Sequence, residues 1–122
     1  MAKLKHYRLK IPVFNGDVHL YIGNEKVFKS WYERTFKDTY TLTNRCGVTL
    51  SLTSKKGIET PIIWLYRAPT DALMVSILCH EAFHAASYLL DEIGCELDVS
   101  SEESYAYVLS YIVEEFLKKV KK

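Results

Sequence analysis

The stretch DALMVSILCHEAFHAASYLLDEI, residues 71–93, decides how the second half of this chain folds. From Ala72 to Leu90 nearly every residue is apolar or small, and the run is too long for a strand, so it predicts a helix. Thr70 is the expected N-cap of this helix, and Gly94 is the expected stop at its C-terminus. Because the helix has so little polar surface, we expect it to be buried on most sides.

Three ionisable side chains stand in the middle of this run, His80, Glu81 and His84, in the sequence HEAFH. On a helix the two histidines lie about 40° apart around the axis and about 6 Å apart along it, so both imidazoles can reach one metal ion. Glu81 lies about 60° from His84 on the other side, which places its carboxylate beside the ion and not on it. This is the HExxH pattern of metal hydrolases.

The chemistry of the pattern is that of a zinc site. Zinc accepts two histidine nitrogens and lowers the pKa of the water that it binds toward about 7. Glu81 is then the general base that takes a proton from this water. The alternative is a metal-free group of hydrogen-bonded core residues. Unpaired polar groups on an apolar helix are costly, which favours the metal, and imidazole with carboxylate ligands favours zinc among the divalent ions.

The segments on either side complete a small α+β fold. After the connection CELDVS (95–100), a second helix is expected from about Ser101 to Lys119, with its apolar residues at helical spacing. The first half of the chain reads as strands and turns with one short amphipathic helix. The expected strands are 6–14, 18–23, 47–53 and 61–66, the helix is 25–36, and the turns are 15–17 and 55–57. We therefore expect one domain, 1–122, in which an antiparallel or mixed sheet packs on two C-terminal helices.

The composition narrows the class of protein. The 122 residues suit one domain, and 48% apolar with 25% charged residues is typical of a globular protein. A net charge of +1 without a dominant basic stripe gives no support for nucleic-acid binding. Three cysteines without a CxxC pair argue against a disulfide framework and favour a reducing cytosol. No signal-peptide pattern is present before Gly23, and the charged groups in HEAFH make the apolar run a poor membrane span.

At this point the sequence resembles a known family. HEAFHAA, followed after a glycine-containing loop by SEESYAY, resembles the zincin-like metallopeptidases of the gluzincin type, and also small phage-encoded HExxH proteins. The likeness covers about Pro61 to Phe116 and implies a minimal zincin-like core that hydrolyses a peptide or protein substrate. It also implies action in the cytoplasm of a bacterial host. In this family the third zinc ligand is a glutamate on the next helix, and Glu103 in ESYA fits that position.

Glu103 has a competing structural role. Ser100 and Glu103 also form a capping box, in which the glutamate turns back to the start of its own helix and is lost as a ligand. If the helix instead begins at Ser101, Glu103 is free to bind the metal. Glu102 is the next candidate for the third ligand, and Asp98 is the last.

Further candidates surround the metal pattern. The resemblance implies a carboxylate or amide four residues past the third ligand, and here that residue is Tyr107, which can donate a hydrogen bond to a substrate oxyanion but is not anionic at neutral pH. Tyr107 is therefore the candidate catalytic tyrosine, with Tyr105 and Tyr111 as alternatives, and plain helix packing is the other explanation for each. Asp91 shares the histidine face, where it either orients a ligand or is a solvated acid.

Two features of the first half complete the prediction. The strand VTLSLT (48–53) is polar on one face, which suits a sheet edge, and in zincins an extended peptide pairs with such an edge. His6 and His19 have no partner at ligand spacing and are expected to be surface or core residues.

Three functional hypotheses follow from the sequence. Zinc-dependent peptide hydrolysis is the first, and a catalytically inert metal-binding module that engages a host or phage protein is the second. A metal-free hydrogen-bonded group is the third.

Overall fold

The computed structural model describes residues 3–12 and 16–121. The elements are β1 (Lys5–Ile11), β2 (Gly16–Ile22), α1 (Glu25–Phe36), β3 (Gly47–Thr53), β4 (Glu59–Leu65), α2 (Ala72–Glu92) and α3 (Glu102–Lys121). The predicted α+β class and the order of elements are confirmed. Of the predicted turn at 15–17, Asn15 lies outside the described residues, while Gly16 and Asp17 already belong to β2.

The four strands form one mixed sheet in the order β1-β2-β4-β3. β1 and β2 make the predicted antiparallel hairpin, and β3 pairs antiparallel with β4. β2 and β4 run parallel in the centre. β3 therefore lies at an edge of the sheet, as the polar alternation of VTLSLT predicted.

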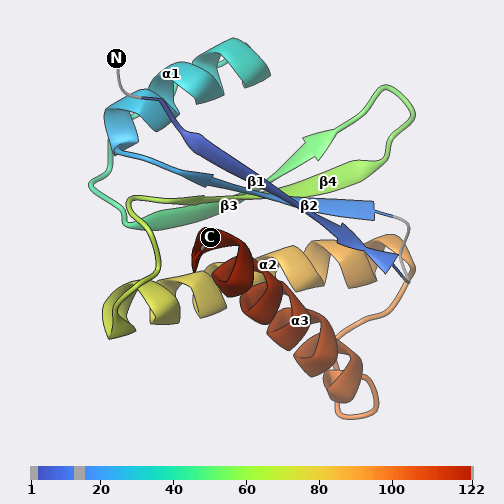
Figure 1. The fold of residues 1–122 in the computed structure, drawn as a ribbon. Coiled ribbons are helices and arrows are strands. Elements are labelled where there is room, and N and C mark those ends of the chain that lie inside the picture. Colours follow the sequence, from blue (N-terminus) through green and yellow to red (C-terminus); the bar gives the residue numbers. More distant parts are fainter. Residues whose placement is uncertain (1–2, 13–15, 122) are drawn as a thin grey trace.

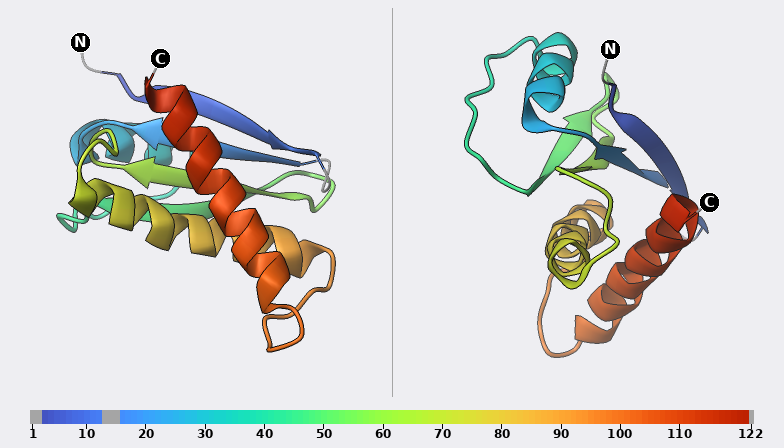
Figure 2. Two further views of the ribbon diagram at one scale, coloured as in Figure 1. Left: turned by 60° about the horizontal axis from the view of Figure 1, so that its bottom comes forward. Right: turned by 60° about the vertical axis from the view of Figure 1, so that its left-hand side comes forward.

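Helices cover both faces of the sheet, so the protein has three layers (Figures 1 and 2). α1 lies on one face, where the ring of Phe28 stacks on Trp64 of β4 with ring centroids 4.7 Å apart. α2 and α3 lie on the other face, where α2 packs under β3 and β4 and α3 packs on α2 and β1. The main core lies between the sheet and these two helices, and it includes Leu20, Ile63, Leu78 and Ile112.

The two faces of β3 have opposite character. Val48 and Leu50 pair with Trp64 and Ile62 and share the face of the sheet that α1 covers. The alternate residues, which include Thr49 and Ser51, point toward α2. The surface that β3 turns toward α2 is thus polar, which is unusual for a strand beside a core helix.

The ends of α2 are set by one acid and one glycine. Asp71, and not Thr70 as predicted, is the N-cap, because its carboxylate accepts a hydrogen bond of 3.0 Å from the amide of Met74. Gly94 ends the helix as predicted, with φ of +76°. The amide of Cys95 then reaches the carbonyl of Leu90 at 2.9 Å, the bond of a Schellman motif.

α2 carries an open stripe that the apolar sequence did not predict. Exposed positions recur at helical spacing at Leu73, Ser76, His80, His84 and Asp91, so the expected burial on most sides leaves this one side open. The opposite side is buried by the sheet and α3. Among the helices of the described residues, α2 alone is long enough and apolar enough to span a membrane. This is weak evidence for a membrane span, because core helices of soluble proteins can have the same length and composition.

Candidate metal site

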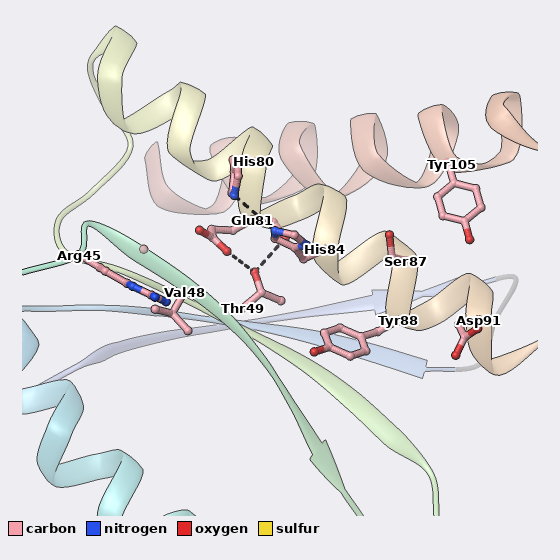
Figure 3. Close-up of a pocket in the computed structure, with 11 residues that line it drawn as sticks. Arg45, Val48, Thr49, His80, Glu81, His84, Ser87, Tyr88, Asp91 and Tyr105 are labelled. Carbon is pink, nitrogen blue, oxygen red and sulfur yellow. Dashed lines mark hydrogen bonds between the residues drawn. The ribbon is translucent and has the colours of Figure 1, made fainter. Parts of the chain in front are cut away.

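His80, Glu81 and His84 form a group whose potential ligand atoms all lie within 4.8 Å of one another. The two imidazoles stand one turn apart on α2, with their Nε2 atoms 3.3 Å apart and their planes inclined by 75° (Figure 3). The helical spacing therefore brings the three side chains together as the sequence predicted.

The separation of the two nitrogens suits a metal ion. Two nitrogens that each lie about 2.05 Å from a tetrahedral zinc are roughly 3.3 Å apart. The Nε2 atoms of His80 and His84 have this separation without rearrangement. The donor set of two imidazoles beside a carboxylate is also one that zinc accepts, so the residues fit the ion.

Both histidines are exposed, whereas Glu81 is buried at 7% relative exposure. The expectation that the histidines of a metal-free group are core residues is therefore wrong, and burial of unpaired imidazoles does not favour a metal here. The reason is the open stripe of α2, because positions 80 and 84 both lie on it while position 81 is rotated toward β3. Exposure leaves the two imidazoles accessible to an ion from solution. A metal-free group stays an alternative, because the two Nε2 atoms lie within hydrogen-bond distance of each other.

Thr49 of β3 holds the Glu81 carboxylate in place. Its hydroxyl lies 2.6 Å from Oε1 of Glu81 and 3.0 Å from the backbone carbonyl of the same residue (Figure 3). This contact joins the sheet edge to the middle of the HEAFH segment. The sequence showed Thr49 only as one polar position of an alternating strand, because a partner so far away along the chain leaves no local signal.

Gly47 allows β3 to approach α2 this closely. A Cβ atom at Gly47 would lie 2.8 Å from Cγ2 of Ile77 and 3.3 Å from Cγ of Glu81. The absence of a side chain here lets the start of β3 pass directly beside the turn of α2 that carries Glu81.

A groove of about 540 Å³ runs between β3 and the open stripe of α2. This volume lies within the range of pockets that bind small molecules, about 300–1,000 Å³. Arg45 lies at one end, the metal group in the middle, and Tyr88 and Asp91 toward the other end (Figure 3). Arg45 and Tyr88 were not predicted, because neither stands in a motif.

The structure does not bring Glu103 to this group. Glu103 is exposed on the first turn of α3, and it neither belongs to the metal group nor lines the groove. The capping box with Ser100 is not formed either. Within residues 3–12 and 16–121 the Glu103 carboxylate makes no hydrogen bond, and α3 begins at Glu102 after Ser101. Whether Glu103 binds the metal therefore stays a prediction.

The other acids near α3 are also away from the groove. Glu102 is exposed as the first residue of α3. Asp98 is used within its own turn, where its carboxylate accepts hydrogen bonds from the amides of Ser100 and Ser101 and from the Ser100 hydroxyl. The Ser100 hydroxyl is the largest influence that lowers the pKa of Asp98. Of the acids that were proposed to support the histidines, Asp91 is the one that lines the groove.

The tyrosines of α3 have three different environments. Tyr107, the candidate catalytic tyrosine, is 71% exposed and does not line the groove. Tyr105 does line it, but its hydroxyl donates to the carbonyl of Cys95 at 2.7 Å. Tyr111 is partly buried against the core. Of the three, Tyr105 is thus the one that lines the groove, and its hydroxyl already has a structural partner.

Comparison with known proteins adds no relative. No family model, no curated protein and no solved structure matches the chain. The resemblance to zincin-like metallopeptidases thus depends on the HEAFH and ESYA motifs.

Proposed function

We propose that this protein is a zinc-dependent metallopeptidase of the zincin-like type, with His80 and His84 as zinc ligands and Glu103 as the predicted third ligand. The observation that supports this most strongly is the 3.3 Å separation of the two Nε2 atoms on the open side of α2, beside a groove. When bound, zinc supplies the Lewis acidity that makes a water molecule nucleophilic near neutral pH. The likeness to phage-encoded proteins leads us to propose the bacterial cytoplasm as the place of action.

Glu81 moves the protons in this proposal. Its Oε1 is held by Thr49, which fixes the carboxylate beside the imidazoles and leaves Oε2 for the proton of the attacking water. Glu81 takes this proton and then delivers it to the amine that leaves when the peptide C–N bond breaks.

The peptide substrate lies along β3. As an edge strand, β3 offers backbone groups to an extended chain, and such pairing tolerates many side chains. Thr49, on the polar face of β3, lines the groove and forms part of its wall.

Metal content and peptide cleavage test the proposal together. We expect about one zinc per chain in untagged protein, lost in His80→Ala and His84→Ala and kept in Glu81→Gln. His6→Ala is the matched control, because it removes an exposed histidine outside the groove. Glu81→Gln should reduce cleavage of a peptide library by roughly 100-fold or more, the usual contribution of a general base. Zinc that persists in both histidine variants, or a cleavage rate that Glu81→Gln leaves unchanged, contradicts the proposal.

The third ligand needs a variant of its own. Glu103→Ala should weaken zinc binding if Glu103 is a ligand, while Glu102→Ala on the same turn serves as its control. Equal zinc content in both variants would exclude Glu103 and leave a site of two histidines with solvent.

A second candidate is a metal-binding module without catalysis. Two observations favour it: the structure places neither Glu103 nor Tyr107 at the groove, and Thr49 already occupies one oxygen of Glu81. Zinc that is bound in stoichiometric amount, with no cleavage of any library peptide, would support this function instead.

A further inference from the structure

The groove has a direction, because β3 and α2 run past each other in the same sense. Gly47 at the start of β3 lies beside Ile77 and Glu81. At the other end, Thr53 pairs with Glu59, whose amide bonds the Glu92 carboxylate at 3.1 Å. The N-terminal end of β3 therefore lies beside the middle of α2, and its C-terminal end lies toward the C-terminal end of α2.

The charged residues that line the groove are arranged along this direction. Arg45 precedes β3 and lies at the starting end (Figure 3). Asp91 lies near the C-terminal end of α2, eleven residues after His80, or about 16 Å further along the helix at 1.5 Å per residue. The metal group lies between the cation and the anion.

These charges match one orientation of a bound peptide. An extended peptide that pairs antiparallel with β3 has its carboxyl end toward Arg45 and its amino end toward Asp91. A parallel peptide would bring its terminal charges toward groups of the same sign. Charge complementarity therefore selects the antiparallel orientation.

Arg45 is suited to receive a carboxylate. It is exposed, and within residues 3–12 and 16–121 it forms no ion pair. Its planar guanidinium binds a carboxylate through two parallel hydrogen bonds, which a lysine cannot reproduce.

The chain before Arg45 is anchored, which reduces the entropy cost of binding. The buried carboxylate of Glu25 accepts hydrogen bonds from the Tyr40 hydroxyl at 2.7 Å, the Thr43 amide at 3.0 Å and the Asn44 amide at 3.0 Å. Asn44, immediately before Arg45, is thus fixed to the start of α1. A preorganised backbone favours specific recognition by the side chain that follows.

We propose that Arg45 binds the C-terminal carboxylate of the substrate, so that the groove selects peptides with a free C-terminus. This deepens the proposed peptidase function and rests on it. Arg45 lies four residues before Thr49, a strand distance of about 13 Å, and its side chain spans part of this distance. The scissile bond is then about two to four residues from the C-terminus. Hydrolysis adds the hydroxyl of water to the acyl carbon and a proton to the leaving amine, which releases a short C-terminal fragment.

The test compares two forms of one peptide library on the zinc-loaded full chain. N-acetylated octapeptides of randomised sequence are supplied as free acids and as C-terminal amides, and the products are identified by mass spectrometry. We expect the acids to be cleaved roughly 10- to 100-fold more efficiently than the amides, as is typical for a charge-assisted contact, with cuts near the C-terminus.

Variants of Arg45 attribute this preference to the residue. Arg45→Met should abolish the preference by raising KM for the acids to that for the amides, and Arg45→Lys should restore part of it. Arg34→Met is the matched control, because Arg34 is an exposed arginine on α1, outside the groove. Zinc content is measured in every variant.

The outcomes separate the two proposals. Zinc-dependent cleavage with equal efficiency on acids and amides, or a preference that Arg45→Met leaves intact, overturns the role of Arg45 and leaves the peptidase standing. Protein that binds zinc but cleaves neither library overturns the peptidase function, and the inference about Arg45 with it.

Discussion

At the scale of single residues, neighbouring positions on α2 have opposite environments. His80 is exposed while Glu81, the next residue, is buried and bonded to Thr49. A helix turns by about 100° per residue, so the histidines face the groove while the glutamate reaches the wall that β3 provides. This combination gives an ion access to the imidazoles and gives the carboxylate a fixed position.

The contact between Thr49 and Glu81 should contribute to stability. Thr49→Val removes the hydroxyl but keeps the shape of the side chain, so the buried carboxylate loses a donor at 2.6 Å. We expect the free energy of unfolding of metal-free protein to fall by about 1–3 kcal/mol, whereas Thr49→Ser, which keeps the hydroxyl, should lose less. Urea unfolding of the three proteins measures this. A Thr49→Val protein as stable as Thr49→Ser would show that the contact contributes nothing.

At the scale of elements, the β1–β2 hairpin brings together two histidines that the sequence left without partners. His6 Nε2 and His19 Nδ1 lie 2.6 Å apart, and the two rings stack with centroids at 4.9 Å. The hairpin pairs His6 with Tyr21 and Arg8 with His19, so the two histidines are diagonal neighbours on one face. One imidazole must act as donor and the other as acceptor, which requires at least one neutral ring.

The contact between His6 and His19 should make the stability of the protein depend on pH. Burial, together with the positive charge of Arg8, lowers the pKa of His6 below 6.5, and burial with the charge of His6 lowers that of His19. The unfolded chain therefore binds protons first, so the stability that the pair contributes is present above pH 6.5 and is lost as pH falls through the folded pKa values. We expect a drop in the free energy of unfolding from pH 7.5 to 5.5.

A double variant identifies the source of that drop. His6→Gln/His19→Gln, measured by urea unfolding at both pH values, should show a smaller difference than the unsubstituted protein. The corresponding double variant of the candidate metal site, His80→Gln/His84→Gln, is the control, because it also replaces two histidines with glutamine. An equal pH dependence in the hairpin variant and the unsubstituted protein would refute the explanation.

At the scale of the whole molecule, α3 completes the core that supports the site. Its buried residues, Tyr105, Val108, Ile112 and Phe116, join the cluster formed by the sheet and α2. α2 therefore carries an open stripe on one side because the sheet and α3 cover the others. The position of the histidines at the surface is a property of the complete fold.

Loss of a large side chain from α3 should therefore destabilise the entire domain. Phe116 is fully buried, so Phe116→Ala should reduce the free energy of unfolding by about 3–5 kcal/mol. Tyr107→Ala on the same helix is the control, because Tyr107 is 71% exposed and should change stability little. Circular dichroism during urea unfolding measures both. A Phe116→Ala protein that unfolds at the same urea concentration as the control would contradict the role of α3.

Much of the local structure could be predicted because it depends on short stretches of chain. Alternation in HYRLKIPVF and GVTLSLT predicted strands, and the long apolar run with Gly94 at its end predicted α2. The spacing of His80 and His84 predicted their approach, because four residues make about one turn of any helix. The sequence predicts the N-cap of α2 one residue too early, because Thr70 and Asp71 are both good caps and only the backbone geometry selects Asp71.

The sequence by itself thus determined the helices, the strands and the histidine pair of HEAFH, because steric and hydrogen-bonding preferences act between near neighbours. Only the tertiary structure decided that β3 lies beside α2, that Thr49 bonds Glu81, that Arg45 lines the groove and that His6 meets His19. It also decided which side of α2 stays open to solvent. These features arise from contacts between segments far apart along the chain, and such contacts form only when the sheet and the helices pack together.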